Sequence, residues 1–331
     1  MSDVIVRLDE RVRLMSAVLA ATDYPERSQK LKPHGTHAHA RATRKHLLKY
    51  TQHPAVQAIQ AYLDQGQPLE ALFALVSLMS WPQLDIPTLP PWVPANFNAQ
   101  LRDFYEATDL KTLWEKDQPL WDKAHLQLTH AFKNVMLKPF FEPFVGKIED
   151  NLVLMPNISY PTAYDVVFKL RNEIICIVPP PLAWGDSPPW PYDEPTMITQ
   201  SYRAAITSFG SILIKAYLRS HMDQLQEIMQ NDLPVHDQFK AQHPTWEDQF
   251  TTLFLSAAVA MYLEDHVDER EYKSYMLMEK KARGMALLPG TVSVLRRYLQ
   301  EVGNNDKYNN LIEFLPIFPK QLRVAQKIVK F

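Results

Sequence analysis

Glycine is scarce in this sequence, with eight residues in a chain of 331. No two of them have the spacing of the G-x-G-x-x-G dinucleotide fingerprint or of the G-x-x-x-x-G-K phosphate loop. Both motifs need glycine because the backbone must approach a phosphate closely. The shortage therefore excludes nucleotide-binding sites of these two kinds.

Cysteine is rarer still, and long apolar runs are missing. The single cysteine, Cys176, cannot form a disulfide within the chain, which suits a reducing compartment. No stretch approaches the ~20 apolar residues of a membrane-spanning helix. The opening residues also lack the apolar core of a secretory signal. The sequence therefore predicts a cytoplasmic protein with no membrane partner.

Charge of neither sign dominates the chain. The 35 basic and 37 acidic residues are interspersed and give a formal charge of −2. This balance produces no extended field for a polyanion, so we expect no nucleic-acid partner. With 46% hydrophobic residues, the composition is that of a globular protein with a sizeable core.

Hydrophobic periodicity predicts a predominantly helical α+β protein. A short strand is expected at Val4–Leu8, and Asp9 is expected to cap a helix that ends near Thr22. In a helix at Lys116–Met136, we expect Leu126 on the buried side. Apolar spacing predicts further helices at Ala40–Thr51, Pro54–Leu63, Leu69–Met79 and Asn98–Ala107.

The pattern changes from helical to strand-like at residue 151. Apolar runs at Asn151–Ile158, Tyr164–Leu170 and Glu173–Val178 predict three strands. The last two are separated by Arg171 and Asn172, which is the spacing of a two-residue hairpin turn. We expect the three strands to form one small antiparallel sheet.

Proline gathers in two irregular segments. Trp81–Pro94 is too rich in proline for a helix or a central strand, and we expect a surface connection that Trp81 and Trp92 anchor. Pro179–Pro195 is longer than ordinary connections, and it is interpreted as a lid or as one wall of a groove.

Two very apolar helices are expected to form the centre of the second half. Ile198–Leu218 has a broad apolar face, and Thr245 begins a helix that continues to Leu263. Helices this apolar need a partner, so the two are predicted to pack together, with Gly210 and Ala257 allowing close approach.

The order of these elements resembles that of zincin-type metallopeptidases: a strand, helices, a hairpin, an irregular segment, a central helix and a supporting helix. The chain is similar in particular to a family of uncharacterised bacterial domains that look like gluzincin-type peptidases with a His-Glu-x-x-His helix. The resemblance covers most of the chain. It is carried by the hairpin and by DERVRLMSAVLAATDY (Asp9–Tyr24), KYTQHPAVQ (Lys49–Gln57), LRDFYEATDL (Leu101–Leu110) and AAITSFGSILI (Ala204–Ile214).

Every chemical position of that family departs from its pattern here. The resemblance places its two histidine ligands at Thr207 and Ser211 and its catalytic glutamate at Ser208. Its third ligand, a glutamate, corresponds to the region of Leu253, and its Arg-Ala pair to Ser256-Ala257. Neutral hydroxyls do not replace imidazole on zinc, and serine is no carboxylate base. We expect no catalytic residue, no metal and no cofactor, and we interpret Thr207, Ser208 and Ser211 as a vestigial site.

Two other polar clusters are candidate sites. Histidines are dense at His34, His37, His39, His46 and His53, but histidines without nearby cysteine or carboxylate are more often packed or solvent-facing polar groups. Glu264, Asp265, His266 and Glu269 follow the second apolar helix, and we interpret them as a solvated helix end.

Cysteine and the aromatic residues of the second proline segment are the remaining candidates. Cys176 lies in an apolar strand and is expected to be a core thiol. Trp184, Trp190 and Tyr192 could line a peptide-binding wall or anchor the segment to the core. The sequence leaves these two alternatives open.

The sequence therefore supports two functional hypotheses. The first is a catalytically inactive metallopeptidase-like protein that acts as a binding or scaffold protein for a peptide or protein. The alternative is a metal-dependent hydrolase whose ligands lie elsewhere. For either, we expect one zincin-like domain over residues 1–331, with a helical part to about residue 95 and a sheet-plus-helices part over about 96–331.

Overall fold

The computed structural model describes residues 2–31, 36–181, 191–304 and 307–329. The chain divides into two compact units, each made of two segments. Unit 1 comprises residues 1–135 and 150–201, and unit 2 comprises residues 136–149 and 202–331. The expectation of one domain, with its parts at about 1–95 and 96–331, stays a prediction.

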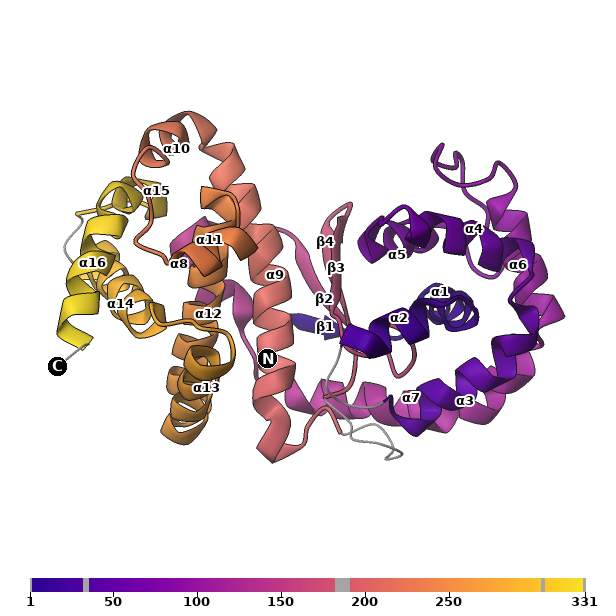
Figure 1. Cartoon of the computed structure of the whole chain (residues 1–331). Helices are drawn as coiled ribbons and strands as arrows, with labels where there is room; N and C mark the ends of the chain where they lie inside the picture. The colour runs from indigo at the N-terminus through magenta and orange to yellow at the C-terminus, as the bar shows by residue number, and fades with distance from the viewer. Residues whose placement is uncertain (1, 32–35, 182–190, 305–306, 330–331) are drawn as a thin grey trace. The chain divides into compact units, whose positions relative to one another are not determined.

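Unit 1 is built around the helix α1, Glu10–Ala21. Every residue of α1 from Val12 onward is buried, so the helix is covered on all sides. Asp9 caps it as predicted, because its carboxylate accepts a hydrogen bond from the Arg11 N–H at 2.9 Å. The other helices of the unit are α2 (Tyr24–Leu31), α3 (Ala38–Leu47), α4 (Pro54–Asp64), α5 (Leu69–Leu78), α6 (Phe97–Ala107) and α7 (Leu110–Ala131). Three of them, α3, α4 and α5, pack against α1 (Figure 1).

The helix α7 forms where a helix was expected, but its buried side differs from the predicted one. Leu126 is 65% exposed, whereas Trp121, Ala124 and Leu128 are buried. Leu126 lies two residues from both Ala124 and Leu128, and two residues in a helix turn a side chain to the opposite side. The prediction of a buried Leu126 is wrong because Trp121 sets the face.

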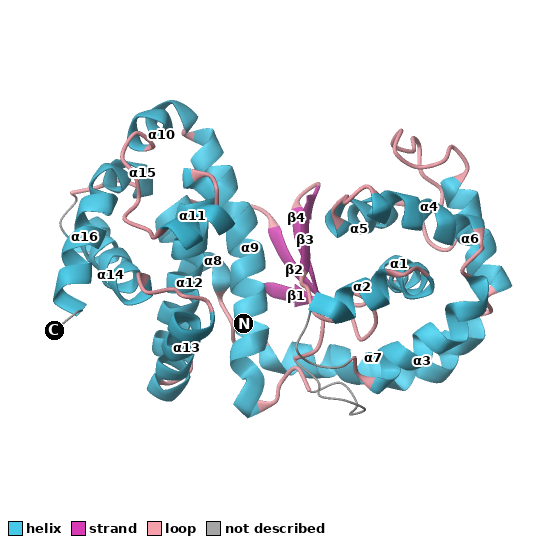
Figure 2. Cartoon of the chain, in the orientation of Figure 1, coloured by secondary structure: helices cyan, strands magenta, loops and turns pink. Residues whose placement is uncertain are grey.

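The sheet of unit 1 has four strands in the order β1-β2-β4-β3 (Figure 2). These are β1 (Val4–Val6), β2 (Asn151–Pro156), β3 (Val166–Leu170) and β4 (Glu173–Val178). The hairpin between β3 and β4 is confirmed, with Leu170 paired to Glu173 across the two-residue turn. However, β1, β2 and β4 are parallel. The expectation of an antiparallel sheet is therefore wrong, and the sheet is mixed.

Burial on both faces explains the near-continuous apolar runs of β2 and β4. Val153 and Ile175 belong to the same core as α1, α4, α5 and α6. Their neighbours Leu152 and Cys176 point to the other face, and both are fully buried as well. Unbroken apolar runs of this kind are typical of parallel strands.

The first proline segment is irregular, as predicted. It contains no helix or strand between α5 and α6. The Trp81 ring lies 5.4 Å from the Tyr105 ring and 5.9 Å from the Trp114 ring. Trp92 packs against Tyr62 at 4.7 Å. The two tryptophans thus anchor the segment, which confirms this part of the prediction.

The regular secondary structure described in unit 2 consists of helices (Figure 2). Its helices are α8 (Leu137–Val145), α9 (Ile198–Ser220), α10 (Met222–Ile228), α11 (Asp237–Gln242), α12 (Trp246–His266), α13 (Glu269–Ala282), α14 (Leu288–Asn304), α15 (Leu311–Phe314) and α16 (Phe318–Val329). The first residues of α9 belong to unit 1, and the helix continues in unit 2. Every residue of α12 from Leu253 to Leu263 is buried, and α13 and α14 pack against it. None of the described helices has the length and apolarity needed to cross a bilayer.

Candidate functional site

The three positions that the sequence resemblance assigns to a metallopeptidase motif, Thr207, Ser208 and Ser211, lie in the middle of α9. Thr207 and Ser211 are one turn apart and half-buried, and Ser208 is buried with 5% of its surface exposed. The Thr207 hydroxyl donates a hydrogen bond to the Arg203 carbonyl oxygen at 2.7 Å. This is the usual bond of a threonine to the carbonyl four residues earlier in its own helix. The Thr207 hydroxyl therefore bonds within its own helix.

Two basic residues flank these positions along the same side of α9. Arg203 precedes Thr207 by one turn, and Lys215 follows it by two turns. The Lys215 ammonium bonds the carboxylate of Asp248 in α12 at 3.0 Å. Hydrogen bonds from Thr245 and from Lys215 hold the pKa of Asp248 below its ordinary value. Like charges repel, so Arg203 disfavours a bound cation nearby, whereas Asp248 offsets the charge of Lys215.

The helices α9 and α12 pack against each other in antiparallel directions, which confirms the predicted pairing. The Tyr202 ring lies 5.6 Å from the Tyr262 ring. Further along α9, Gly210 faces Leu255, whose side chain fills the space where a β-carbon would stand. These two contacts show that the helices run antiparallel: eight residues along α9 correspond to seven residues back along α12.

This register places Leu253, the expected third-ligand position, level with the polar residues of α9. Leu253 lies two residues before Leu255, at the height of Ser211 on α9. Its side chain is buried and lines a small cavity with Phe239 and Met285. An apolar side chain among apolar neighbours offers no ligand to a metal.

Sequence reasoning missed a buried polar group on α13. Glu279 is 1% exposed, and neither carboxylate oxygen has a hydrogen-bond partner among the described residues. Burial raises the pKa of Glu279, and the positive charges of Arg283 and Arg203 oppose that rise. One turn earlier, burial raises the pKa of Tyr275, and the nearby Glu279 carboxylate raises it further. The sequence contains one weak signal for this burial. Tyr275 and Glu279 are four residues apart, so they lie on the same side of the helix.

The histidines of the N-terminal half do not form one site. His34 lies outside the described residues, and the other four have separate neighbours. His37 and His53 cap helices, and His39 is buried beside Asp117 at 3.9 Å. A ring nitrogen of His37 accepts a hydrogen bond from the Ala40 N–H. The His46 ring bonds the Thr108 carbonyl, and the His53 ring bonds the Asp103 carboxylate. The structure thus supports their interpretation as packed polar groups.

The acidic cluster at the end of α12 and the start of α13 is a solvated helix end. Glu264, Asp265, His266 and Glu269 are all exposed. Asp265 accepts a hydrogen bond from the Arg296 guanidinium at 2.7 Å. The interpretation as a helix terminus is confirmed.

Tyr192 is an anchor within unit 1. It is 1% exposed, and its hydroxyl donates to the Val178 carbonyl at 2.8 Å and accepts from the Asn157 N–H at 3.2 Å. Of the two alternatives for this segment, Tyr192 follows the anchoring one, while Trp184 and Trp190 lie outside the described residues. Cys176 is fully buried in β4, as expected of a core thiol.

Within the described ranges, no three His, Cys, Asp or Glu side chains lie together as a metal site requires. The chain matches no protein-family model, and neither a curated protein nor a solved structure is significantly similar to it. The chemistry of the residues themselves must therefore carry the functional argument.

Proposed function

We propose that the protein is a non-catalytic relative of zincin-type metallopeptidases that acts as a binding or scaffold protein. The observation that carries the proposal is the stripe of Arg203, Thr207, Ser211 and Lys215 along α9. Hydroxyls occupy the positions that would hold imidazole ligands, and basic groups stand on both sides of them.

The element order supports the zincin-like part of the proposal. A strand, helices, the β3–β4 hairpin, the long α9 and then α12 follow one another along the chain. The antiparallel packing of α12 on α9 sets Leu253 level with Ser211. Leu253 lies two residues from Leu255, which faces α9, so its side chain points away from α9 and the packing supports only the pairing of the two helices. Fold analogy is a weaker argument than site chemistry, so the experiment addresses the site.

The binding part of the proposal rests on the strand β3. In the sheet of the described residues, β3 lies at the edge and pairs only with β4. Edge strands can bind an extended peptide by main-chain hydrogen bonds, with side-chain pockets adding specificity. Such binding needs no metal and no catalytic group, so it can persist in a protein without peptidase chemistry.

Metal content of the purified protein separates the proposal from the hydrolase alternative. We expect far less than one transition metal ion per chain by elemental analysis after mild purification, and no uptake of zinc that survives dialysis. A stoichiometric ion would contradict the proposal, because bound metals of catalytic sites are retained.

The mode of binding has its own test. An extended-peptide library selected against the protein should yield ligands that slow hydrogen exchange of the β3 backbone, Val166–Leu170. Protection confined to other segments would refute strand addition at this edge while leaving the non-catalytic assignment intact.

A further inference from the structure

Unit 1 contains a polar cavity of about 260 Å³ that takes no part in the proposed function. It lies where the β3–β4 turn meets the beginning of α1 and the end of α5. Three arginines and one glutamate line it, together with Ser77 and Asn172: Arg7, Arg11, Arg171 and Glu173. The lining therefore carries an excess of positive charge.

Two of the arginines are fixed in place by other groups. Arg7 makes a two-pronged ion pair with Glu173, at 2.8 and 2.7 Å. Arg11 donates to both carboxylate oxygens of Asp9 and to the Ser77 and Met79 carbonyls. Each fork is thus held rigidly. Arg7 still has guanidinium N–H groups left over, because a guanidinium has five and the pair with Glu173 uses two.

Arg171 has no hydrogen-bond or charged partner among the described residues, although it lines the same cavity. It is the first residue of the two-residue turn, and its φ is +54°. That left-handed conformation favours glycine, and an arginine there is strained. Glycine would suit this turn position better, and the exposed Arg171 side chain makes no described contact that stabilises the turn.

The wall of the cavity also contains an unpaired buried polar group. Ser77 is 6% exposed, and its hydroxyl has no hydrogen-bond partner among the described residues. Leaving a buried hydroxyl unpaired is unfavourable unless a ligand or water completes it. Paired guanidinium forks match the geometry of phosphate and carboxylate groups.

We propose that this cavity binds a small oxyanion, a phosphate or carboxylate group, between Arg171 and the outer N–H groups of Arg7. The size of the cavity admits one such group with a short organic attachment. The site is independent of α9, so it stands whether or not the protein is zincin-like.

Calorimetric titration tests this site with inorganic phosphate and with succinate at constant ionic strength. We expect saturable one-to-one binding of at least one probe, and the stronger probe identifies whether the ligand group is phosphate or carboxylate. Arg171→Gly should weaken binding at least tenfold, because it removes the unpaired guanidinium and leaves a residue suited to the turn. Arg171→Lys should weaken it less, because one charge remains.

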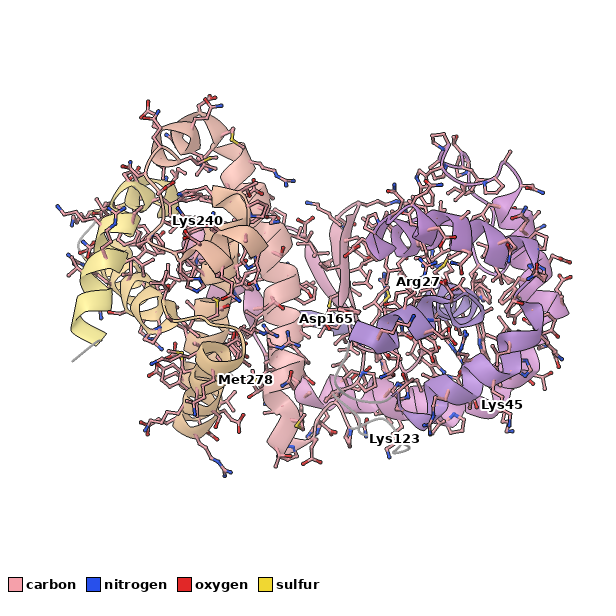
Figure 3. All side chains as sticks on the ribbon, in the orientation of Figure 1. Arg27, Lys45, Lys123, Asp165, Lys240 and Met278 are labelled. Atoms are coloured by element: carbon pink, nitrogen blue, oxygen red, sulfur yellow. The ribbon has the colours of Figure 1, made fainter. Side chains whose placement is uncertain are left out.

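A matched control uses Lys45, an exposed lysine of α3 that does not line the cavity (Figure 3). Lys45→Ala should bind like the parent, while thermal unfolding shows that all variants are folded. No saturable binding of either probe, or equal binding by Arg171→Gly and the parent, would overturn the proposal. Equal losses from Lys45→Ala and Arg171→Gly would also overturn it, by indicating only a general charge effect.

Discussion

Gly210 and Leu255 approach so closely that no side chain fits between them. A β-carbon on Gly210 would lie 2.5 Å from Leu255 Cδ2 and 2.9 Å from Phe141 Cζ. Contacts below 3.0 Å require a neighbour to move, and the Phe141 ring is fully buried. Glycine at this position therefore sets the distance between α9 and α12.

Gly210→Ala should lower the free energy of unfolding by on the order of 1 kcal/mol. Overpacking costs about 1 to 3 kcal/mol, and the better helix propensity of alanine offsets up to about 1 kcal/mol of that cost. Denaturant unfolding measures the difference. Gly290→Ala in α14 is the matched control: its nearest neighbour would be Ala325 Cβ at 3.3 Å, so we expect a change within about 0.5 kcal/mol.

The same clash can be tested by removing its other partner. In a Leu255→Ala background, Gly210→Ala should cost less than in the parent, because the closest obstructing methyl group is gone while the Phe141 ring remains. A double-mutant cycle measures this coupling. Equal costs in both backgrounds would show that the two residues are not in contact.

Phe254→Ala should destabilise the protein by about 3 to 5 kcal/mol. Phe254 is fully buried in α12, and its ring lies 5.1 Å from Phe144 and 6.0 Å from Phe250. Leu126→Ala is the control on an exposed face, and its effect should stay within about 0.5 kcal/mol. A loss below about 1 kcal/mol for Phe254→Ala would mean that the core of unit 2 is misplaced.

Local patterns made most helices of this fold predictable. Asp9 and Thr245 begin helices as the sequence indicates, because a cap depends on residues only two or three positions apart. The hairpin was equally predictable, since Arg171 and Asn172 fix its loop length. By contrast, α8 was missed because its sequence, LKPFFEPFV, contains two prolines that usually interrupt helices.

Relationships between distant segments were not predictable from such patterns. The parallel pairing of Val4 with Leu152 joins residues far apart in the chain, and short apolar runs do not specify strand direction. In the candidate site, Thr207 and Ser211 were placed on one side of a helix by spacing alone. The burial of Glu279 depends on which side of α13 meets α12, and its neighbours in sequence, such as Lys280, are equally charged.

Stability should rise with pH through the titration of His39. Burial lowers the pKa of His39, Arg13 lowers it further, and Asp117 opposes the shift. Below the ordinary histidine pKa of about 6.5, the unfolded state therefore binds more protons than the folded state. Stability is then fully present above that value and declines as pH falls toward the lower folded-state pKa.

His39→Gln should reduce the difference in free energy of unfolding between pH 5.5 and pH 8. The exposed His266 provides a control, and His266→Gln should leave that difference nearly unchanged. An undiminished pH dependence in His39→Gln would show that His39 is not the group responsible.

Zinc binding by α9 tests the central claim most directly. Thr207→His with Ser208→Glu and Ser211→His restores two imidazoles at the spacing that places both on one ion. Isothermal titration compares this triple variant with the parent and with Thr207→His alone, which has a single imidazole. We predict measurable zinc affinity in the triple variant and none in the parent. A folded triple variant that binds zinc no better than Thr207→His would contradict the zincin-like register of α9.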